Sequence, residues 1–203
     1  MTVVSTGIDV SGNNGSFKPD PKASFRAVKA AGHSWCYIKA TEGETYAFSR
    51  LASWADAAKN ADLWVGAYHF AQPGVDDARR EADHYLRHIA GIPLELAPVL
   101  DLETATIAPG ALVKWALAWT EHVQAATGRQ PMLYTYTYFW KSALAKTPAL
   151  SHLGLWQADY RAKPENLPPW PQPDIWQYTG KGSVPGITGH VDLNRANVTI
   201  LGL

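Results

Sequence analysis

Several features that mark particular classes of protein are scarce or missing in this sequence of 203 residues. It has one cysteine, Cys36, so no disulfide can form within the chain, and its apolar surroundings at 35–38 predict a small buried side chain. Lys and Arg together number 18, as do Asp and Glu, so the formal net charge is zero. We therefore expect no basic face that would attract nucleic acid or an anionic membrane.

Long apolar runs are also missing. No stretch approaches the roughly 20 apolar residues that a membrane-spanning helix needs. Residues 1–17 contain no Lys or Arg and no apolar run, so they do not resemble a signal peptide. We expect a protein that is made in the cytoplasm, acts as a monomer, and needs neither a cofactor nor a metal.

Aromatic residues, by contrast, are plentiful, with nine Trp and nine Tyr. They predict either a well-filled core or a groove with flat apolar platforms, on which the C–H faces of sugars stack. Composition alone leaves both interpretations open. A chain of this length can bury one sizeable core, so we expect residues 1–203 to form a single domain.

Two acidic residues follow an apolar stretch near the middle of the chain. Residues 97–100 carry no polar side chain, and Asp101 and Glu103 come directly after them. Residues two apart in a strand project to the same side, so both carboxyls should lie together at the end of a buried strand. Solvated acids at a strand end would give the same pattern. A protonated carboxyl beside an ionised one is, however, typical of acid-catalysed glycoside cleavage.

Short β-prone runs alternate with helical patterns over the first three quarters of the chain. Strands are predicted at 7–11, 35–40, 63–70, 97–104, 132–137, 155–160, 175–178 and 191–193. Helices are predicted after the first five strands, near 25–31, 48–55, 78–89, 109–123 and 140–146. The proline-rich segment 164–173 is expected to be a long loop rather than a linker, because residues 174–203 are too few for another domain.

Five strand–helix units followed by three strands predict an α/β fold with a parallel sheet of eight strands, enough to close an irregular barrel. Such barrels carry their chemistry at the carboxyl ends of the strands. Polar residues fall at those predicted ends: Asp9, Glu42, His69, Asp101, Glu103, Asp159, Gln177 and Asp192. An open doubly wound sheet is the alternative, but residues 12–15 match its glycine-rich phosphate loop poorly.

Eight short motifs make the sequence similar to the muramidases of glycoside hydrolase family 25. They are GIDVS (7–11), KATEG (39–43), GAYHF (66–70), PVLDLE (98–103), YT (134–135), LWQADY (155–160), IWQY (175–178) and VDLN (191–194). They occur in the family's order and cover nearly the whole chain. The resemblance implies an irregular barrel of five β/α units plus three strands. It also implies lysozyme activity, the cleavage of the β-1,4 bond between N-acetylmuramic acid and N-acetylglucosamine in bacterial peptidoglycan.

The resemblance also implies roles for individual residues. Glu103 matches the proton donor, and Asp101 matches an acid that stays ionised and assists the substrate's own N-acetyl group, which retains the anomeric configuration. Asp9 and Asp192 match acids that complete the catalytic set. The substrate-binding residues are expected to be Tyr68, Tyr134, Trp156, Gln177 and Glu42. One departure is Asn14, where the family often has Gln before the glycine.

Several residues keep a second interpretation. Asp9 could cap a turn, and Glu42 could pair with Lys39 instead of contacting substrate. His69 is expected to be a hydrogen-bonded histidine at the rim rather than a catalytic base. The remaining histidines are assigned no role.

Two other functions remain open at this point. One is a wall-binding barrel without turnover, which the presence of Glu103 disfavours. The other is a metal-dependent hydrolase that uses Asp9, His69, Asp101 and Asp192, although the sequence has no H-E-x-x-H motif. If the muramidase interpretation holds, a protein without a signal peptide needs a separate release route to reach the bacterial wall, as phage lysins do.

Overall fold

The structure is a computed structural model that describes residues 4–12 and 20–197. Its strands are β1 (Val4–Val10), β2 (Trp35–Glu42), β3 (Tyr46–Ala47), β4 (Trp64–Phe70), β5 (Val99–Asp101), β6 (Met132–Tyr136), β7 (Gly154–Ala158), β8 (Ile175–Gly182) and β9 (Val191–Asn197). Its helices are α1 (Pro21–Ala30), α2 (Leu51–Lys59), α3 (Ala78–Ile89), α4 (Pro109–Thr127) and α5 (Thr137–Ser142), with a short 3₁₀ turn at Pro148–Leu150.

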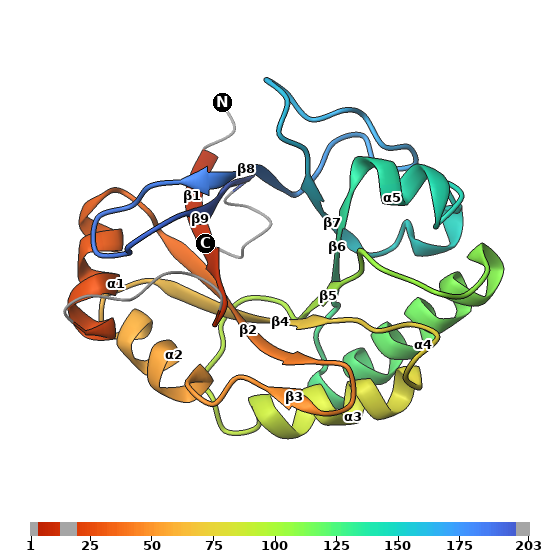
Figure 1. Ribbon diagram of the computed structural model, residues 1–203, viewed down its shortest axis with the longest axis horizontal. Helices are drawn as coiled ribbons and strands as arrows, with labels where there is room; N and C mark the ends of the chain where they lie inside the picture. Colours follow the sequence, from red (N-terminus) through yellow and green to blue (C-terminus); the bar gives the residue numbers. More distant parts are fainter. Residues whose placement is uncertain (1–3, 13–19, 198–203) are drawn as a thin grey trace.

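Eight of the strands close into a barrel. The sheet runs in the order β1-β9-β8-β7-β6-β5-β4-β2, and β1 pairs with β2 to complete the ring, while β3 extends β2 outside it. Figure 1 looks into this ring, with the helices around its outside. The α/β barrel expected from the sequence is thereby confirmed, and the open doubly wound alternative is wrong.

The last strand departs from the expected parallel sheet. Strands β1, β2 and β4–β8 run parallel, but β9 is antiparallel to both β1 and β8. A loop of a few residues joins β8 to β9, and so short a connection permits only an antiparallel return. Asp192 therefore lies near the start of its strand rather than at the end, and it still reaches the same end of the barrel as Asp9.

Capping residues mark the start of α3 and the end of α4, whereas α5 departs from its predicted range. The side chain of Asp77 caps the start of α3, and Gly128 closes α4 with a φ of 68°. Helix α5 begins at Thr137 and does not extend to Lys146 as predicted, since Ala145 and Lys146 have φ values of 51° and 55°. Its buried Trp140 packs on Trp170 at a ring-centroid distance of 4.6 Å, which anchors the proline-rich loop to the barrel.

Aromatic side chains fill the barrel interior, and two glycines on the neighbouring strands leave room for their rings. Trp35 and Tyr37 on β2 are fully buried inside the ring, and Gly7 and Gly66 are their partners on the neighbouring strands. A Cβ atom would lie 2.1 Å from the Trp35 ring at Gly7 and 2.2 Å from the Tyr37 ring at Gly66. These rings form the floor on which the next layer of side chains rests.

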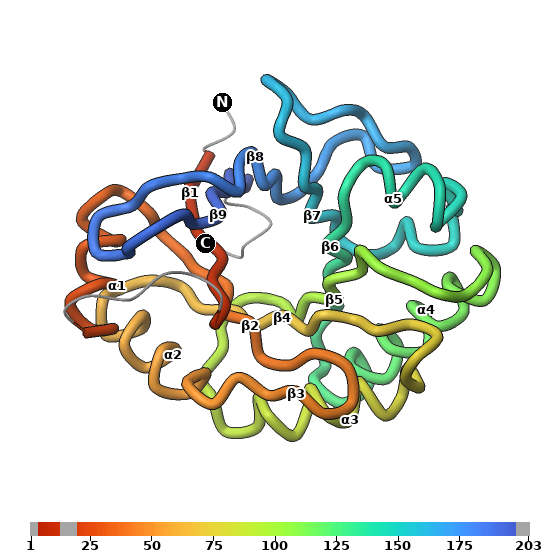
Figure 2. The backbone as a smooth tube through the Cα atoms, viewed as in Figure 1, coloured from red at the N-terminus to blue at the C-terminus, as the bar shows by residue number. Residues whose placement is uncertain are grey.

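The larger apolar cluster lies between the barrel and the surrounding helices. Cys36 is fully buried in it, as expected. In the smooth trace of Figure 2, α1 to α4 follow the left and lower sides of the ring, while α5 and the long loop occupy the upper right. In the part of the chain that the structure describes, none of the helices is long and apolar enough to cross a membrane.

Candidate active site

Asp101 is the last residue of β5, and Glu103 follows two residues later, beyond the strand, so β5 is shorter than the predicted strand over 97–104. Both line one cavity at the end of the barrel where the parallel strands finish, which we call the mouth. Asp101 is only 7% exposed, and its neighbours Leu100 and Leu102 are fully buried. Its Oδ1 atom is buried and has no hydrogen-bond partner among the described residues.

Asp9 and Asp192 form a second carboxyl pair across the cavity. They are register partners on β1 and β9, and the charge of Asp192 acts on the carboxyl of Asp9. The Oδ2 atom of Asp9 also accepts hydrogen bonds from Nδ2 of Asn194 at 2.7 Å and from Nε2 of Gln177 at 3.1 Å. Because Oδ2 of Asp9 already accepts two hydrogen bonds from amide groups, a proton on this carboxyl would be bound to Oδ1.

Aromatic side chains fix the amides that hold Asp9. The indole N–H of Trp156 donates to Oδ1 of Asn194 at 2.9 Å. The hydroxyls of Tyr134 and Tyr160 donate to Oε1 of Gln177 at 3.1 and 2.9 Å. Both amides are therefore locked in one orientation, so Asp9 faces amide donors rather than amide oxygens.

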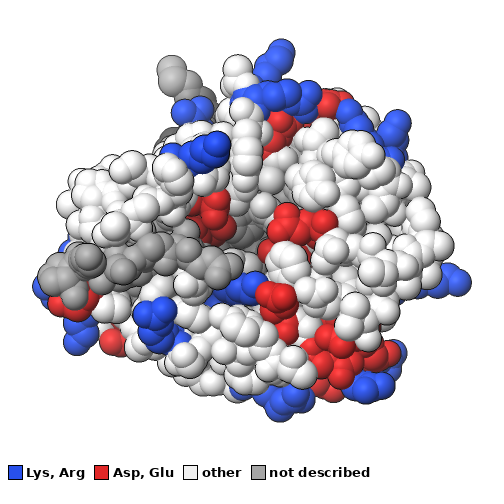
Figure 3. Space-filling view, viewed as in Figure 1, with Lys and Arg blue, Asp and Glu red and all other residues white. Residues whose placement is uncertain are grey.

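The two carboxyl pairs share a cavity of about 280 Å³. Figure 3 shows acidic side chains around the hollow at the centre of this face, with a basic side chain beside them. The other residues that line it are Ser11, Lys39, Tyr68, Phe70, Val99, Tyr134, Trp156, Tyr160 and Gln177. A hollow with acids on two sides and tyrosines between them suits a polar substrate that needs a proton.

Burial raises the pKa of all four carboxyls. The pKa of Asp9 rises to about 8 through burial and then through the charge of Asp192. Burial raises the pKa of Asp192 to about 6. The pKa of Glu103 is raised by burial and by Asp192, and that of Asp101 is raised well above its ordinary range by burial and by Glu103.

The ionised state expected for Asp101 differs from what its surroundings favour. Asp101 is more deeply buried than Glu103, and only the positive charge of Lys39 opposes the rise in its pKa. Four carboxyls in one small cavity cannot all carry a negative charge near neutral pH. The protonation of the four carboxyls is therefore linked, and a charge or hydrogen-bond donor brought beside one of them changes which carboxyl gives up a proton.

Three residues expected at the mouth lie elsewhere. The His69 side chain is fully buried and stacks on Trp119 outside the barrel, because Tyr68 takes the inward position on β4. Glu42 is not among the residues that line the cavity and pairs with Lys39 at 2.6 Å. Asp159 pairs with Arg161, whose hydrogen bonds lower the pKa of the carboxyl.

Trp156 reaches the cavity but offers no open ring face. It is 1% exposed, with ring centroids 4.9 Å from Tyr37 and 5.3 Å from Tyr134, so it forms floor rather than wall. Tyr68 and Tyr134 line the cavity as expected. Asn14 lies outside the described residues.

Three residues of the site, two that line the cavity and one that hydrogen-bonds Asp9 beneath it, were not singled out from the sequence. Asn194 lies two positions after Asp192 on β9, a spacing that places both side chains on one face. Tyr160 follows β7, and its role depends on reaching Gln177 across the sheet. Lys39 was considered only as a partner for Glu42, although it lines the cavity itself.

A metal site was the alternative use for these acids. Within residues 4–12 and 20–197, no group of three or more His, Cys, Asp or Glu is placed to hold a metal ion. The histidine of that alternative set points away from the cavity. In the described part of the chain, the four residues of that alternative set are therefore not brought together, because His69 lies outside the cavity that the three aspartates line.

Comparison with known proteins identifies the family to which this barrel belongs. The sequence model of glycosyl hydrolases family 25 matches residues 8–187, from β1 to the loop before β9. The chain belongs to this family. Asp9, Asp101 and Glu103 fall within the matched range, and Asp192 lies just beyond it.

Individual relatives agree with the family assignment. The autolytic lysozyme of Clostridium acetobutylicum is 33% identical over 199 residues, which is 96% of this chain and 56% of that protein. An N,O-diacetylmuramidase of Chalaropsis sp. is 32% identical over 85% of this chain and 91% of its own length. The crystal structure of a bacterial lysozyme from Streptomyces coelicolor superposes with a TM-score of 0.88 at 29% identity, covering 100% of this chain and 98% of that one.

The share of each relative that is matched differs. The chain spans little more than half of the Clostridium protein but nearly all of the Streptomyces coelicolor structure. The barrel is therefore the part that these family 25 proteins have in common.

Proposed function

We propose that this protein is a muramidase that cleaves the β-1,4 bond between N-acetylmuramic acid and N-acetylglucosamine in bacterial peptidoglycan. The observation that carries the proposal is the pair of buried carboxyls, Asp101 and Glu103, facing Asp9 and Asp192 across one cavity of a family 25 barrel. Relatives named lysozyme and N,O-diacetylmuramidase support the choice of substrate. Residues 1–203 act as one catalytic domain and, in this proposal, as a monomer.

Glu103 is the proton donor to the leaving oxygen. It is the more accessible carboxyl of its pair, and a raised pKa keeps it protonated where a free glutamic acid would be ionised. The loss of the aglycone needs both this proton and stabilisation of an oxocarbenium-like centre. The nearby charge of Asp192 contributes to that raised pKa.

Asp101 orients the 2-acetamido group of the sugar under attack. Its unpartnered Oδ1 can accept the amide N–H of that group, which favours the ionised form of Asp101. The amide oxygen then attacks the anomeric carbon, and water opens the resulting intermediate, so the configuration is retained. Asp9 and Asp192 hold the facing side of the cavity, and Tyr68 and Tyr134 line its walls.

The products released from purified peptidoglycan test this proposal. Mass spectrometry should find disaccharide-peptides with a reducing muramic acid end, and NMR should show the β anomer first. A reducing glucosamine end would indicate a glucosaminidase, and free stem peptides would indicate an amidase. Wall binding without any release would support the binding-only alternative. In this proposal the site of action is the bacterial cell wall.

A further inference from the structure

Lys39 is the cation that lines the acidic cavity. It is 8% exposed, and its Nζ atom lies 4.7 Å from the centre of the Phe70 ring and 5.5 Å from that of Tyr46. Two aromatic rings hold a cation by attraction to their faces without neutralising its charge. A positive charge so placed can act on the carboxyls of the cavity.

Its ion-pair partner, however, is Glu42 rather than a cavity carboxyl. Nζ of Lys39 donates to Oε2 of Glu42 at 2.6 Å, and no ion pair joins it to Asp101 or Glu103 among the described residues. The Oδ1 atom of Asp101 meanwhile has no hydrogen-bond donor, although Lys39 is close enough to affect its charge. The ammonium is thus held to one side of an unpartnered acceptor.

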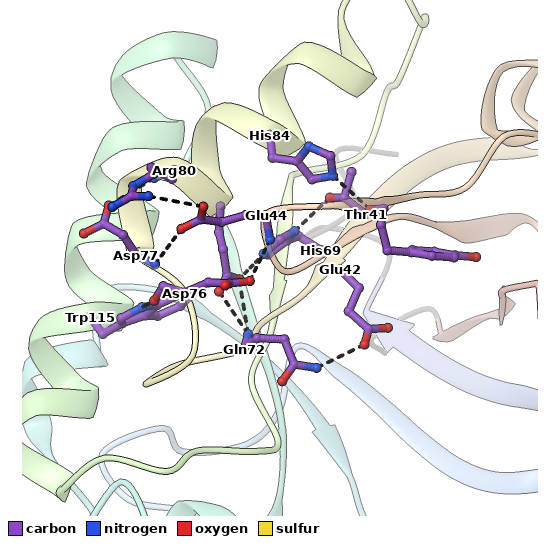
Figure 4. Close-up of polar contacts among 12 residues, drawn as sticks. Thr41, Glu42, Glu44, His69, Gln72, Asp76, Asp77, Arg80, His84 and Trp115 are labelled. Atoms are coloured by element: carbon purple, nitrogen blue, oxygen red, sulfur yellow. Dashed lines mark hydrogen bonds and ion pairs between the residues drawn. The ribbon is translucent and has the colours of Figure 1, made fainter.

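A second hydrogen bond fixes the carboxyl of Glu42. Its other oxygen, Oε1, accepts a hydrogen bond from Nε2 of Gln72 at 3.0 Å. The backbone N–H of Gln72 donates to the carboxyl of Glu81 at 3.2 Å, and Glu81 contacts Nε2 of His69 at 2.6 Å. Figure 4 shows these links running from Glu42 through Gln72 to His69 and Thr41.

The end of this chain of contacts is fully buried. Burial lowers the pKa of His69 to about 3 and raises that of Glu81 to about 8, so it disfavours the charged form of each. The turn between β2 and β3 is also joined to the start of α3, because the backbone N–H of Asp77 donates to Oε1 of Glu44 at 2.9 Å. Gln72 therefore presents its side-chain amide to Glu42 from a fixed backbone.

We propose that Glu42 and Gln72 are positioning residues that keep the Lys39 ammonium from pairing with Asp101 and Glu103. This inference rests on the proposed function only for its kinetic consequences. If the restraint were removed, the ammonium would move to the unpartnered oxygen of Asp101 and stabilise the ionised carboxylates. The general acid would then lose its proton at a lower pH.

The sign of the effect follows from the groups that face Lys39. They are Glu42 on its own strand, and Asp101 and Glu103 from β5 and the residues after it; the charge of Lys39 also reaches His69 on the outer side of β4. The charge of Lys39 lowers the pKa of Asp101 and of Glu103, and that of Glu42 raises the pKa of Asp101. Freeing Lys39 should lower both carboxyl pKa values, while deleting Lys39 should raise them.

The test compares Glu42→Gln, Gln72→Met, Lys39→Met and the double variant Lys39→Met/Glu42→Gln. The first readout is ¹³C NMR titration of the Asp and Glu carboxyls, which needs no catalysis. Glu42→Gln should move the titration of Asp101 and Glu103 down by roughly 1–3 pH units, as a new contact with a cation does. Gln72→Met, which changes no charge, should move it the same way by less, and Lys39→Met should move it up.

The double variant separates restraint of Lys39 from a direct effect of Glu42. Once Lys39 is methionine, Glu42→Gln should cause a smaller downward shift, because only the direct charge of Glu42 on Asp101 is then removed. An undiminished shift there would show that Glu42 acts by its own charge alone and would overturn the inference. Glu44→Gln is the matched control, because its carboxyl contacts the backbone of Asp77 instead of Lys39, and it should leave the titration unchanged. Folding is checked for each variant by near-UV circular dichroism.

The second readout is the alkaline limb of the pH–rate profile on peptidoglycan. It should move with the NMR titration in each variant. A Gln72→Met protein that loses rate with both the titration and the profile unmoved would show a purely structural role and overturn the inference. A wild-type protein that releases no muramic acid ends would overturn the proposed function, while the NMR titrations would still decide the role of Glu42 and Gln72.

Discussion

At the scale of single residues, linked protonation distinguishes this site from a simple acid pair. Asp9 and Asp192 are register partners, and amide donors from Gln177 and Asn194 fix Asp9. Burial raises the pKa of both carboxyls, and the charge of Asp192 raises that of Asp9 further. Protonation of this pair is therefore linked to that of Glu103, whose pKa Asp192 also raises.

Glu103→Gln should abolish turnover while preserving binding to the wall. Glutamine has the shape of the protonated acid but no proton to give, so the rate should fall by on the order of 10² to 10⁴. The rate of release of reducing ends, measured beside a peptidoglycan pull-down, checks both halves. Near-normal turnover of this variant would remove Glu103 from the role of general acid.

Asp9→Asn should stabilise the fold, and more so at high pH. The pKa of Asp9 is about 8 in the folded protein, against an ordinary value of 3.8. The folded state therefore keeps a proton that the unfolded state loses, and stability declines as the pH rises from about 4 through 8. Asparagine mimics the protonated acid, so the gain in the free energy of unfolding should grow from pH 5 to pH 9.

Urea denaturation at the two pH values measures this gain. Asp159→Asn supplies the contrast, because Arg161 lowers the pKa of Asp159 and the resulting stabilisation is present throughout this range. That variant should lose stability equally at pH 5 and pH 9. A benefit of Asp9→Asn that is no larger at pH 9 would contradict the raised pKa of Asp9.

At the scale of strands, the aromatic side chains packed inside the ring determine where along the barrel axis the site lies. Trp35 and Tyr37 fill the lower barrel because their register partners are glycines. Lys39 follows Tyr37 on the same face of β2, as Asp101 follows Val99 on β5. Each ionisable side chain thus rests one layer above an apolar one.

Gly66→Ala should destabilise the protein by roughly 1–3 kcal/mol, the usual result of overpacking a core. The added methyl group would lie 2.2 Å from the Tyr37 ring, which is itself enclosed by the floor of the site. Chemical denaturation gives the value. Gly110→Ala is the control, since its Cβ meets no atom within 4 Å in the first turn of α4, and it should be neutral or stabilising.

At the scale of the whole molecule, the closed ring brings distant segments into one cavity. The first strand contributes Asp9 and the last contributes Asp192, with Asp101 and Glu103 from the middle of the chain. Zero formal net charge is compatible with this acidic mouth, because the other charges are spread over the rest of the surface. The acids act on a neutral sugar bond, so no cation is required by the chemistry proposed.

Dialysis against a chelator should therefore leave the rate of peptidoglycan cleavage unchanged. Proton donation by Glu103 and assistance by the substrate's amide account for both requirements of the reaction. The measurement is the initial rate before and after dialysis, with zinc or manganese added back. A loss that either ion restores would favour the metal-dependent alternative.

The sequence by itself determined the α/β barrel, the approximate limits of its strands and the acids at their ends. Alternation of strands and helices and the i, i+2 spacing of Asp101 and Glu103 are local properties that a linear pattern records. The tertiary structure decided how these groups are used. Whether His69 faces the cavity, whether Glu42 binds Lys39, and how burial shifts each pKa depend on neighbours distant in the chain. Electrostatic energies depend on distance and burial, which only the folded packing fixes.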